Sequence, residues 1–282
     1  MAEVRDTTVI IPAFNEADGI AETIQGLRTQ GFAEILVVDD GSTDETAARA
    51  EVAGARVVRH PYNKGNGAAV KTGIREAGSA TVLLMDADTQ HDPAEAVRLV
   101  EPVGTYDMVI GARLLGDQPV VRAMGNAVFR SLASWLTGRP IPDLTSGYRA
   151  ARREALLEVI HLLPNGFSYP TTSCLALMKS GRNVLFVPIT ARSRVGTSKI
   201  RPLKDGLRFI LIIFKIVTLY APIRVFAPIA GTSFLIGVAY GIWNVVKFQK
   251  IPIGSALLIQ LGVVVFLFGL IAEQIASTQD RR

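Results

Sequence analysis

Two long apolar runs near the C-terminal end constrain the fold of this chain more than any other feature. Neither residues 225–246 nor residues 251–272 include a charged side chain. Each run is about 22 residues long, which is enough for a helix to cross about 30 Å of hydrocarbon. Because only residues 247–250 connect them, we predict a transmembrane helical hairpin over residues 225–282. A buried hairpin in a soluble protein is the less favoured alternative.

The segment before these runs is strongly basic. Between residues 192 and 224, eight lysine and arginine side chains accompany a single acidic one, Asp205. Basic and apolar residues are interleaved over residues 203–220, which is typical of an amphipathic helix lying on an anionic lipid surface. We assign residues 201–224 to such a juxtamembrane segment and expect the lipid bilayer to be a partner of this chain.

The distribution of basic residues also predicts an orientation in the membrane. A basic stretch precedes the first run, and Arg281 and Arg282 follow the second, which favours placing both ends in the cytoplasm. Lys247 and Lys250, between the runs, count slightly against this orientation. The sequence thus indicates an integral protein of the inner or plasma membrane, with its N-terminal domain and both termini in the cytoplasm.

The N-terminal half has a different pattern, in which strands alternate with helices. Short apolar runs predict five strands, at residues 7–11, 34–38, 56–58, 81–85 and 107–110. Helix-forming stretches separate them, which indicates a parallel sheet with helices on both faces. The net charge of +5 is modest and unevenly spread, so nucleic acid is not expected as a partner. The single cysteine, Cys174, excludes an internal disulfide framework.

The predicted strand at residues 81–85 ends in two carboxylates, Asp86 and Asp88. Ligands of open α/β sheets bind at the carboxyl ends of the strands, so these side chains are expected where chemistry takes place. Carboxylate oxygens suit Mg²⁺ or Mn²⁺, which complete their coordination with water and substrate phosphates. A strand-end turn that caps the next helix is the alternative at this position.

Gly65 and Gly67 open the helix-forming stretch after the third predicted strand. Their spacing matches neither a dinucleotide-binding fingerprint nor a P-loop. We interpret them as a tight helix entry that lets the backbone approach a ligand.

Six short motifs follow one another along the N-terminal domain. They are Pro12-Ala13-Phe14-Asn15-Glu16, Val38-Asp39-Asp40-Gly41-Ser42, Asn63-Lys64-Gly65, Asp86-Ala87-Asp88-Thr89-Gln90, Gly111-Ala112-Arg113 and Asp143-Leu144-Thr145-Ser146-Gly147-Tyr148-Arg149. In this order and spacing the chain resembles family 2 glycosyltransferases, and within them the polyprenyl-phosphate glycosyltransferases, which include dolichyl-phosphate mannose synthase. The resemblance covers about residues 7–200. It implies a GT-A fold, a Rossmann-like α/β domain, over residues 1–200.

By position, the resemblance also implies which residues hold a nucleotide-sugar donor and its metal. The donor nucleotide would contact Pro12, Phe14, Glu16, Val38, Asp40, Asp86, Ala87, Arg194 and Lys199. Asp40 would accept hydrogen bonds from the base, and Asp86, Asp88 and Gln90 would hold Mg²⁺ or Mn²⁺. The metal would neutralise the charge that develops on the leaving diphosphate. His91 is expected to support these ligands rather than to bind the metal.

The motif at residues 143–149 is implied to face a polyprenyl-phosphate acceptor. By the resemblance, Asp143 is the proposed base and, with Asp88, a catalytic residue, while Arg113, Ser146 and Arg149 would bind the acceptor phosphate. A phosphate monoester has a second pKa of about 6 and is largely ionised at neutral pH, so orienting other groups is an alternative role for Asp143. A helix start with Ser146 as its cap is the alternative interpretation of the motif.

Together these features predict a membrane hexosyltransferase that moves a sugar from a nucleotide diphosphate to a polyprenyl phosphate by one inverting displacement. A UDP-sugar and undecaprenyl phosphate are favoured because the two-span tail resembles bacterial members, and GDP-mannose is the alternative donor. A processive polysaccharide synthase is less favoured, because the chain has two spans and no Gln-x-x-Arg-Trp motif. A scaffold that binds nucleotide sugars without catalysis is disfavoured by the presence of Asp86, Asp88, Gln90 and Asp143. The sequence is also compatible with a homo-oligomer.

Overall fold

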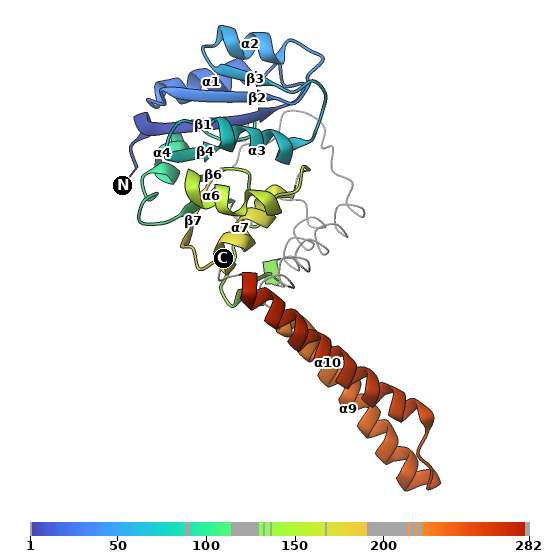
Figure 1. The fold of residues 1–282 in the computed structure, drawn as a ribbon. Coiled ribbons are helices and arrows are strands. Elements are labelled where there is room, and N and C mark those ends of the chain that lie inside the picture. Colours follow the sequence, from blue (N-terminus) through green and yellow to red (C-terminus); the bar gives the residue numbers. More distant parts are fainter. Residues whose placement is uncertain are drawn as a thin grey trace. The chain divides into compact units, whose positions relative to one another are not determined.

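The chain divides into two compact units, Met1–Ile210 and Leu211–Arg282 (Figure 1). The computed structural model describes residues 2–87, 91–113, 130–131, 133–135, 137–166, 168–190, 214, 218 and 222–279. Most of the basic segment at residues 201–224 therefore lies outside the described residues.

The first unit is built on a seven-stranded sheet. Its strands are β1 (Thr7–Ala13), β2 (Glu34–Asp39), β3 (Arg56–Arg59), β4 (Thr81–Leu84), β5 (Met108–Arg113), β6 (Arg149–Arg152) and β7 (Val184–Ile189). They lie in the order β3-β2-β1-β4-β6-β5-β7. Strand β6 runs antiparallel to both of its neighbours, β4 and β5, and every other neighbouring pair is parallel.

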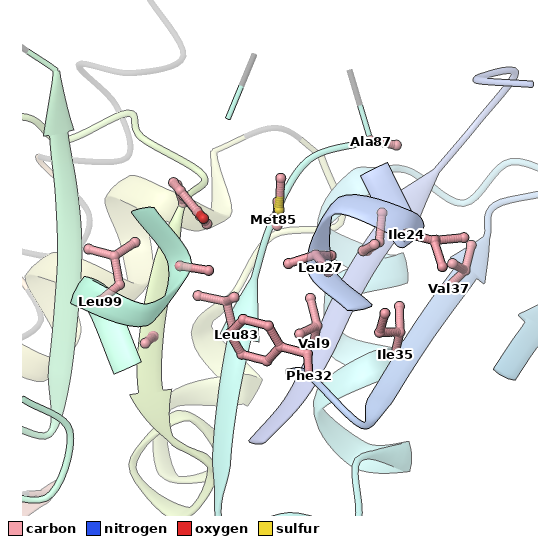
Figure 2. Close-up of a cluster of buried hydrophobic side chains, with 14 of the residues drawn as sticks. Val9, Ile24, Leu27, Phe32, Ile35, Val37, Leu83, Met85, Ala87 and Leu99 are labelled. Carbon is pink, nitrogen blue, oxygen red and sulfur yellow. The ribbon is translucent and has the colours of Figure 1, made fainter. Parts of the chain in front are cut away.

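Helices cover both faces of this sheet (Figure 1). They are α1 (Ile20–Thr29), α2 (Thr46–Val52), α3 (Asn66–Glu76), α4 (Ala94–Val100), α6 (Arg153–Val159) and α7 (Tyr169–Lys179), with short 3₁₀ turns η1 (Val4–Asp6) and η2 (Ile160–Leu162). Figure 2 shows the core on the α1 and α4 face, where Leu27 and Leu99 of the two helices meet Val9 and Leu83 of the sheet. All four side chains are fully buried. Burying one leucine contributes about 2 kcal/mol, so this packing holds the strand ends in place.

All five predicted strands are confirmed, and each begins within one residue of its expected position. The expectation of a wholly parallel sheet is wrong for β6. Its sequence, Arg-Ala-Ala-Arg, lacks the β-branched and aromatic residues that mark a strand, but the two alanines fit between β4 and β5. The interpretation of Ser146 as the cap of a helix is also wrong. Arg149 begins strand β6, and the next helix begins only at Arg153.

The second unit is a pair of long helices, α9 (Ile223–Phe248) and α10 (Ile253–Gln279). The helices are joined by side-chain to backbone hydrogen bonds, from Ser233 Oγ to Leu258 O at 2.9 Å and from Ser255 Oγ to Gly237 O at 2.8 Å. Both helices are long and apolar enough to cross a membrane, over Ile223–Phe248 and Ile253–Ala276. Only 17% of each apolar window is buried, which favours a hairpin in lipid over a hairpin buried in a soluble protein.

Candidate functional site

The carboxyl ends of β1 and β2 form one side of the candidate site. The loop after β1 is fixed to the loop after β2, because Asn15 N donates to Ser42 Oγ at 3.0 Å and Thr43 N donates to Asn15 Oδ1 at 2.9 Å. Asn15 has a φ of 55°, a left-handed conformation that asparagine tolerates better than most residues. Of the residues expected to contact the nucleotide here, Pro12 and Val38 are buried, and Phe14 and Glu16 are half-buried.

Asp40, expected to accept hydrogen bonds from the base, lies buried at the end of β2. Its Oδ1 accepts from Lys64 N at 3.0 Å and lies 2.7 Å from His60 Nδ1, and its Oδ2 accepts from Gly65 N at 2.7 Å. His60 Nε2 in turn lies 2.9 Å from Thr72 Oγ1 of α3. A carboxylate has about four acceptor positions, so Asp40 holds the 63–65 loop and keeps capacity for one more donor. A contact with the base stays a prediction.

The two glycines that open α3 lie against a neighbouring loop. A Cβ placed on Gly65 would lie 2.4 Å from Asn165 O, and one placed on Gly67 would lie 2.1 Å from Pro164 O. Ala68 N donates to the same Asn165 O at 3.1 Å. The glycines therefore allow close approach to the backbone of residues 164–166, and an approach to a ligand stays a prediction.

Asp86 lies just beyond the carboxyl end of β4, and its side chain is 32% exposed. Its Oδ2 lies 3.7 Å from Nε2 of His91, whose ring stacks on Tyr148 with centroids 4.6 Å apart. Burial acts to raise the pKa of Asp86, but His91, with the charges of Arg149 and Arg113, outweighs it, and the net pKa lies below its ordinary value. Asp86 is therefore an ionised carboxylate at neutral pH.

An ionised, partly exposed carboxylate fits the role of a divalent-cation ligand. Nδ1 of the neighbouring His91 is buried and has no hydrogen-bond partner among the described residues. The described residues contain no cluster of three or more His, Cys, Asp or Glu side chains that could hold a metal by themselves. Asp88 and Gln90, the other expected ligands, and Arg194 and Lys199 lie outside the described residues. Ala87, between the two aspartates, is buried.

Gly147 lets the neighbouring loop lie directly against Asp86. A Cβ at this position would be 2.4 Å from Asp86 Oδ2, closer than any side chain tolerates. We predict that Gly147→Ala displaces the Asp86 carboxylate and weakens binding of UDP in the presence of Mn²⁺ by about tenfold. Calorimetry measures this affinity directly.

Gly166→Ala is the matched control, because a Cβ there would meet no atom within 4 Å. The control should bind UDP and Mn²⁺ like the wild type. Equal affinities for the Gly147→Ala variant and the control would contradict the role given to Asp86.

Arg113, the last residue of β5, forms a bidentate ion pair with Asp143. Arg113 Nε donates to Asp143 Oδ2 at 2.8 Å, and Nη2 donates to Oδ1 at 3.2 Å. The Thr145 and Ser146 amides also donate to Oδ1, at 2.9 and 3.2 Å. Burial acts to raise the pKa of Asp143, but the hydrogen bonds and charge of Arg113 outweigh it and lower the pKa. The structure thus brings together three of the residues expected at the acceptor, Asp143, Arg113 and Ser146.

Arg149, the fourth residue expected at the acceptor, has no exposed surface. Its guanidinium donates to protein groups, among them Pro170 O at 2.8 Å and Ser173 Oγ at 2.9 Å. Because Nη1 and Nη2 already donate to protein groups, direct contact of Arg149 with an acceptor phosphate does not fit, and its expected role is corrected accordingly. Ser146 keeps a buried hydroxyl with no partner among the described residues.

Two residues that shape the site, His60 and Thr145, had no predicted role. His60 directly follows β3, so the rule that located Asp86 at a strand end could have found it. Thr145 Oγ1 accepts from Arg113 Nη2 at 2.6 Å and donates to Asp143 Oδ1 at 3.1 Å. Only the folded loop reveals this contact, because nothing in the sequence separates Thr145 from an ordinary turn residue.

Two family models match the chain. The model of glycosyl transferase family 2 matches residues 8–160, and the model of the GtrB C-terminal hairpin matches residues 221–278. The second match coincides with α9 and α10. The chain therefore combines a transferase domain with a hairpin that has a family of its own.

Two similar proteins come from an archaeon and a bacterium. Glycosyltransferase AglJ of Haloferax volcanii is 31% identical over 95% of this chain and 93% of its own length. Undecaprenyl-phosphate mannosyltransferase of Micrococcus luteus is 31% identical over 67% of this chain and 85% of its own length.

Among solved structures, glucosyl-3-phosphoglycerate synthase from Mycobacterium tuberculosis, in complex with Mn²⁺, UDP and glucosyl-3-phosphoglycerate, has a TM-score of 0.62. It is 23% identical and covers 76% of this chain and 80% of its own. This likeness supports the GT-A fold. The family model matches residues 8–160, and AglJ is similar over nearly the whole chain. The chain therefore belongs to glycosyl transferase family 2.

Proposed function

We propose that this chain transfers a sugar from a nucleotide diphosphate, with UDP favoured over GDP, to a polyprenyl phosphate. The observation that carries the proposal is the union of a family 2 transferase domain with two candidate membrane spans in one chain. A polyprenyl acceptor keeps its chain in the bilayer and its phosphate at the headgroup level, so its enzyme must work at the membrane. The relative named for undecaprenyl phosphate supports this class of acceptor.

The donor would bind along the edge that runs from Asp40 to Asp86. The base would lie between the loops after β1 and β2, lined by Pro12, Phe14, Glu16, Val38 and Ala87. Asp86, Asp88 and Gln90 would hold Mg²⁺ or Mn²⁺, and Arg194 and Lys199 would close over the diphosphate. The bound metal would stabilise the charge of the leaving nucleoside diphosphate.

The acceptor phosphate would bind Arg113 and Ser146. Arg113 would contribute its positive charge, and its side chain is 26% exposed. Asp143 would hold the guanidinium in place through the bidentate ion pair to Nε and Nη2. Because the phosphate is already ionised at neutral pH, its oxygen can attack the anomeric carbon without a base. A single in-line displacement would invert that carbon.

The donor is identified by screening nucleotide sugars against undecaprenyl phosphate in liposomes that contain the purified full-length chain. The proposal expects one UDP-sugar to be used in preference to GDP-mannose. Preference for GDP-mannose would overturn the choice of base and leave the acceptor class intact. Hydrolysis of every donor without a lipid product would overturn the proposal itself.

The role given to Asp143 predicts a moderate effect of Asp143→Asn. Because the amide keeps the size of the carboxylate but loses the charge that holds Arg113, we expect kcat to fall by about 10- to 100-fold. The pKa of Asp143 lies below its ordinary value of 3.8, so the group is ionised at every pH from about 5 upward. Wild type and variant should therefore share one pH profile between about pH 5 and 9.

A general base would behave differently. A base must be ionised to act, so the wild-type rate would fall as the pH is lowered, and the Asp143→Asn variant would not show this fall. Such a difference would mean that Asp143 removes a proton in the rate-limiting step. That outcome would contradict the orienting role. Asp107→Asn, a substitution at the opposite end of β5, serves as the control for the loss of a buried carboxylate.

A further inference from the structure

Arg149 is the bulkiest fully buried side chain in the described part of the chain. Burying a charged group is costly unless it is paired or hydrogen-bonded. Arg149 has no carboxylate within salt-bridge distance among the described residues, and its Nη nitrogens donate to uncharged groups instead. Burial lowers the pKa of its guanidinium, but an arginine keeps its charge at neutral pH. A buried charge of this kind needs a role that an apolar side chain could not fill.

The guanidinium joins two segments that are distant in sequence. Nη1 donates to Pro170 O at 2.8 Å and to Ser173 Oγ at 2.9 Å, both in the first turns of α7. Nη2 donates to the carbonyl of Ser146, in the loop that carries Asp143. The Tyr169 ring lies 6.0 Å from the guanidinium carbon, within range of a cation–π contact. Arg149 therefore ties the 143–147 loop to α7.

Ser146 is consequently held from both sides. Its amide donates to Asp143 Oδ1 at 3.2 Å, and its carbonyl accepts from Arg149. The next residue, Gly147, lies against the Asp86 carboxylate. Electrostatic attraction also links Arg149 to both carboxylates, Asp143 and Asp86. A shift of the Ser146 carbonyl would thus move the groups proposed to contact the acceptor and the wall beside the metal ligand.

We propose that Arg149 is a positioning residue that fixes the 143–147 loop, and through it Asp143, Arg113 and Ser146, without touching either substrate. The inference rests on the proposed function for its kinetic consequence only. Because Arg149 acts on the acceptor side of the site, it should affect turnover more strongly than binding of the nucleotide.

The test compares Arg149→Lys and Ser173→Ala with the control Arg152→Lys in the full-length chain. Lysine keeps the charge but cannot donate to both Ser146 and α7 in the fork geometry, and Ser173→Ala removes one partner of Arg149 without changing the loop. Arg152 lies three residues further along β6 and is bonded to Gly104 O, away from the site. All variants are measured for UDP affinity with Mn²⁺, for kcat and KM, and for deuterium exchange of the Thr145 and Ser146 amides.

Arg149→Lys is expected to lower kcat about tenfold and Ser173→Ala about threefold, while UDP affinity changes less than about twofold. Amide exchange at residues 143–148 should rise in both variants and stay at the wild-type level in Arg152→Lys. Wild-type kcat together with unchanged exchange in both variants would overturn the inference. Loss of UDP affinity in proportion to kcat would also overturn it, because Arg149 would then be a general core residue. If the wild type transfers nothing to a lipid phosphate, the proposed function fails and the exchange data alone decide on Arg149.

Discussion

Asp86→Asn is expected to lower sugar transfer by on the order of 10³-fold, the largest effect of any single substitution in this site. The amide has the same shape but lacks the negative charge that His91, Arg149 and Arg113 stabilise in the folded protein. Without that charge the divalent cation and the donor diphosphate lose one of their anchors. Rates measured at saturating donor and several Mn²⁺ concentrations separate weaker metal binding from slower transfer.

Asp92→Asn is the matched control for this substitution. Asp92 lies on the same loop, and its side chain accepts from Ala94 N at 3.0 Å, a bond that asparagine can also form. Its main-chain carbonyl, which accepts from Tyr148 OH, is unaffected. The control should keep activity within about twofold of the wild type. Removal of metal with EDTA should reproduce the Asp86→Asn defect, and undiminished transfer after metal removal would refute the metal site.

Removal of the membrane segment is expected to have the second largest effect. A chain truncated at Arg201 keeps every residue expected to bind the nucleotide and metal, so it should bind UDP and Mn²⁺ normally. Its transfer to long-chain polyprenyl phosphate in liposomes should fall by about 100-fold, because the acceptor phosphate and the site are no longer held at one surface. Activity on the same liposomes, with and without residues 202–282, is the measurement.

A short-chain, water-soluble acceptor provides the control for this truncation. It removes the need for docking, so the truncated chain should recover a substantial part of its activity with it. Lys204→Glu combined with Arg208→Glu in the full-length chain should give a milder defect, since each basic residue contributes about 1 kcal/mol to binding an anionic surface. Equal rates of the truncated and full-length chains on liposomes would show that the tail has no part in presenting the acceptor.

The fold could be predicted well from the sequence where apolar runs were flanked by turn residues. The strands β1, β2, β3, β4 and β5 and the two C-terminal helices all have such patterns, and all were found. Strand β6 could not be predicted, because its two alanines form a strand only through the space between β4 and β5. Strand β7, Val184–Ile189, is also an apolar run and could have been predicted in the same way.

The candidate site was predictable in its residue types and less so in their roles. Strand-end rules and family motifs located Asp40, Asp86, Arg113 and Asp143. They could not show that Asp40 binds the 63–65 loop, since hydrogen bonds to Lys64 N and Gly65 N depend on three-dimensional proximity. The burial of Arg149 was hidden for the same reason, because a basic residue after an acceptor motif looks like a phosphate ligand until its neighbours are known.

The lipid product of one reaction tests the proposed sugar transfer most directly. The purified full-length chain, in liposomes with undecaprenyl phosphate, Mn²⁺ and its preferred nucleotide sugar, should form a lipid whose mass exceeds that of the acceptor by one sugar residue. One nucleoside diphosphate should be released per lipid formed, with inversion at the anomeric carbon. Lipids that carry several sugars, or release of nucleoside diphosphate with no glycosylated lipid, would contradict it.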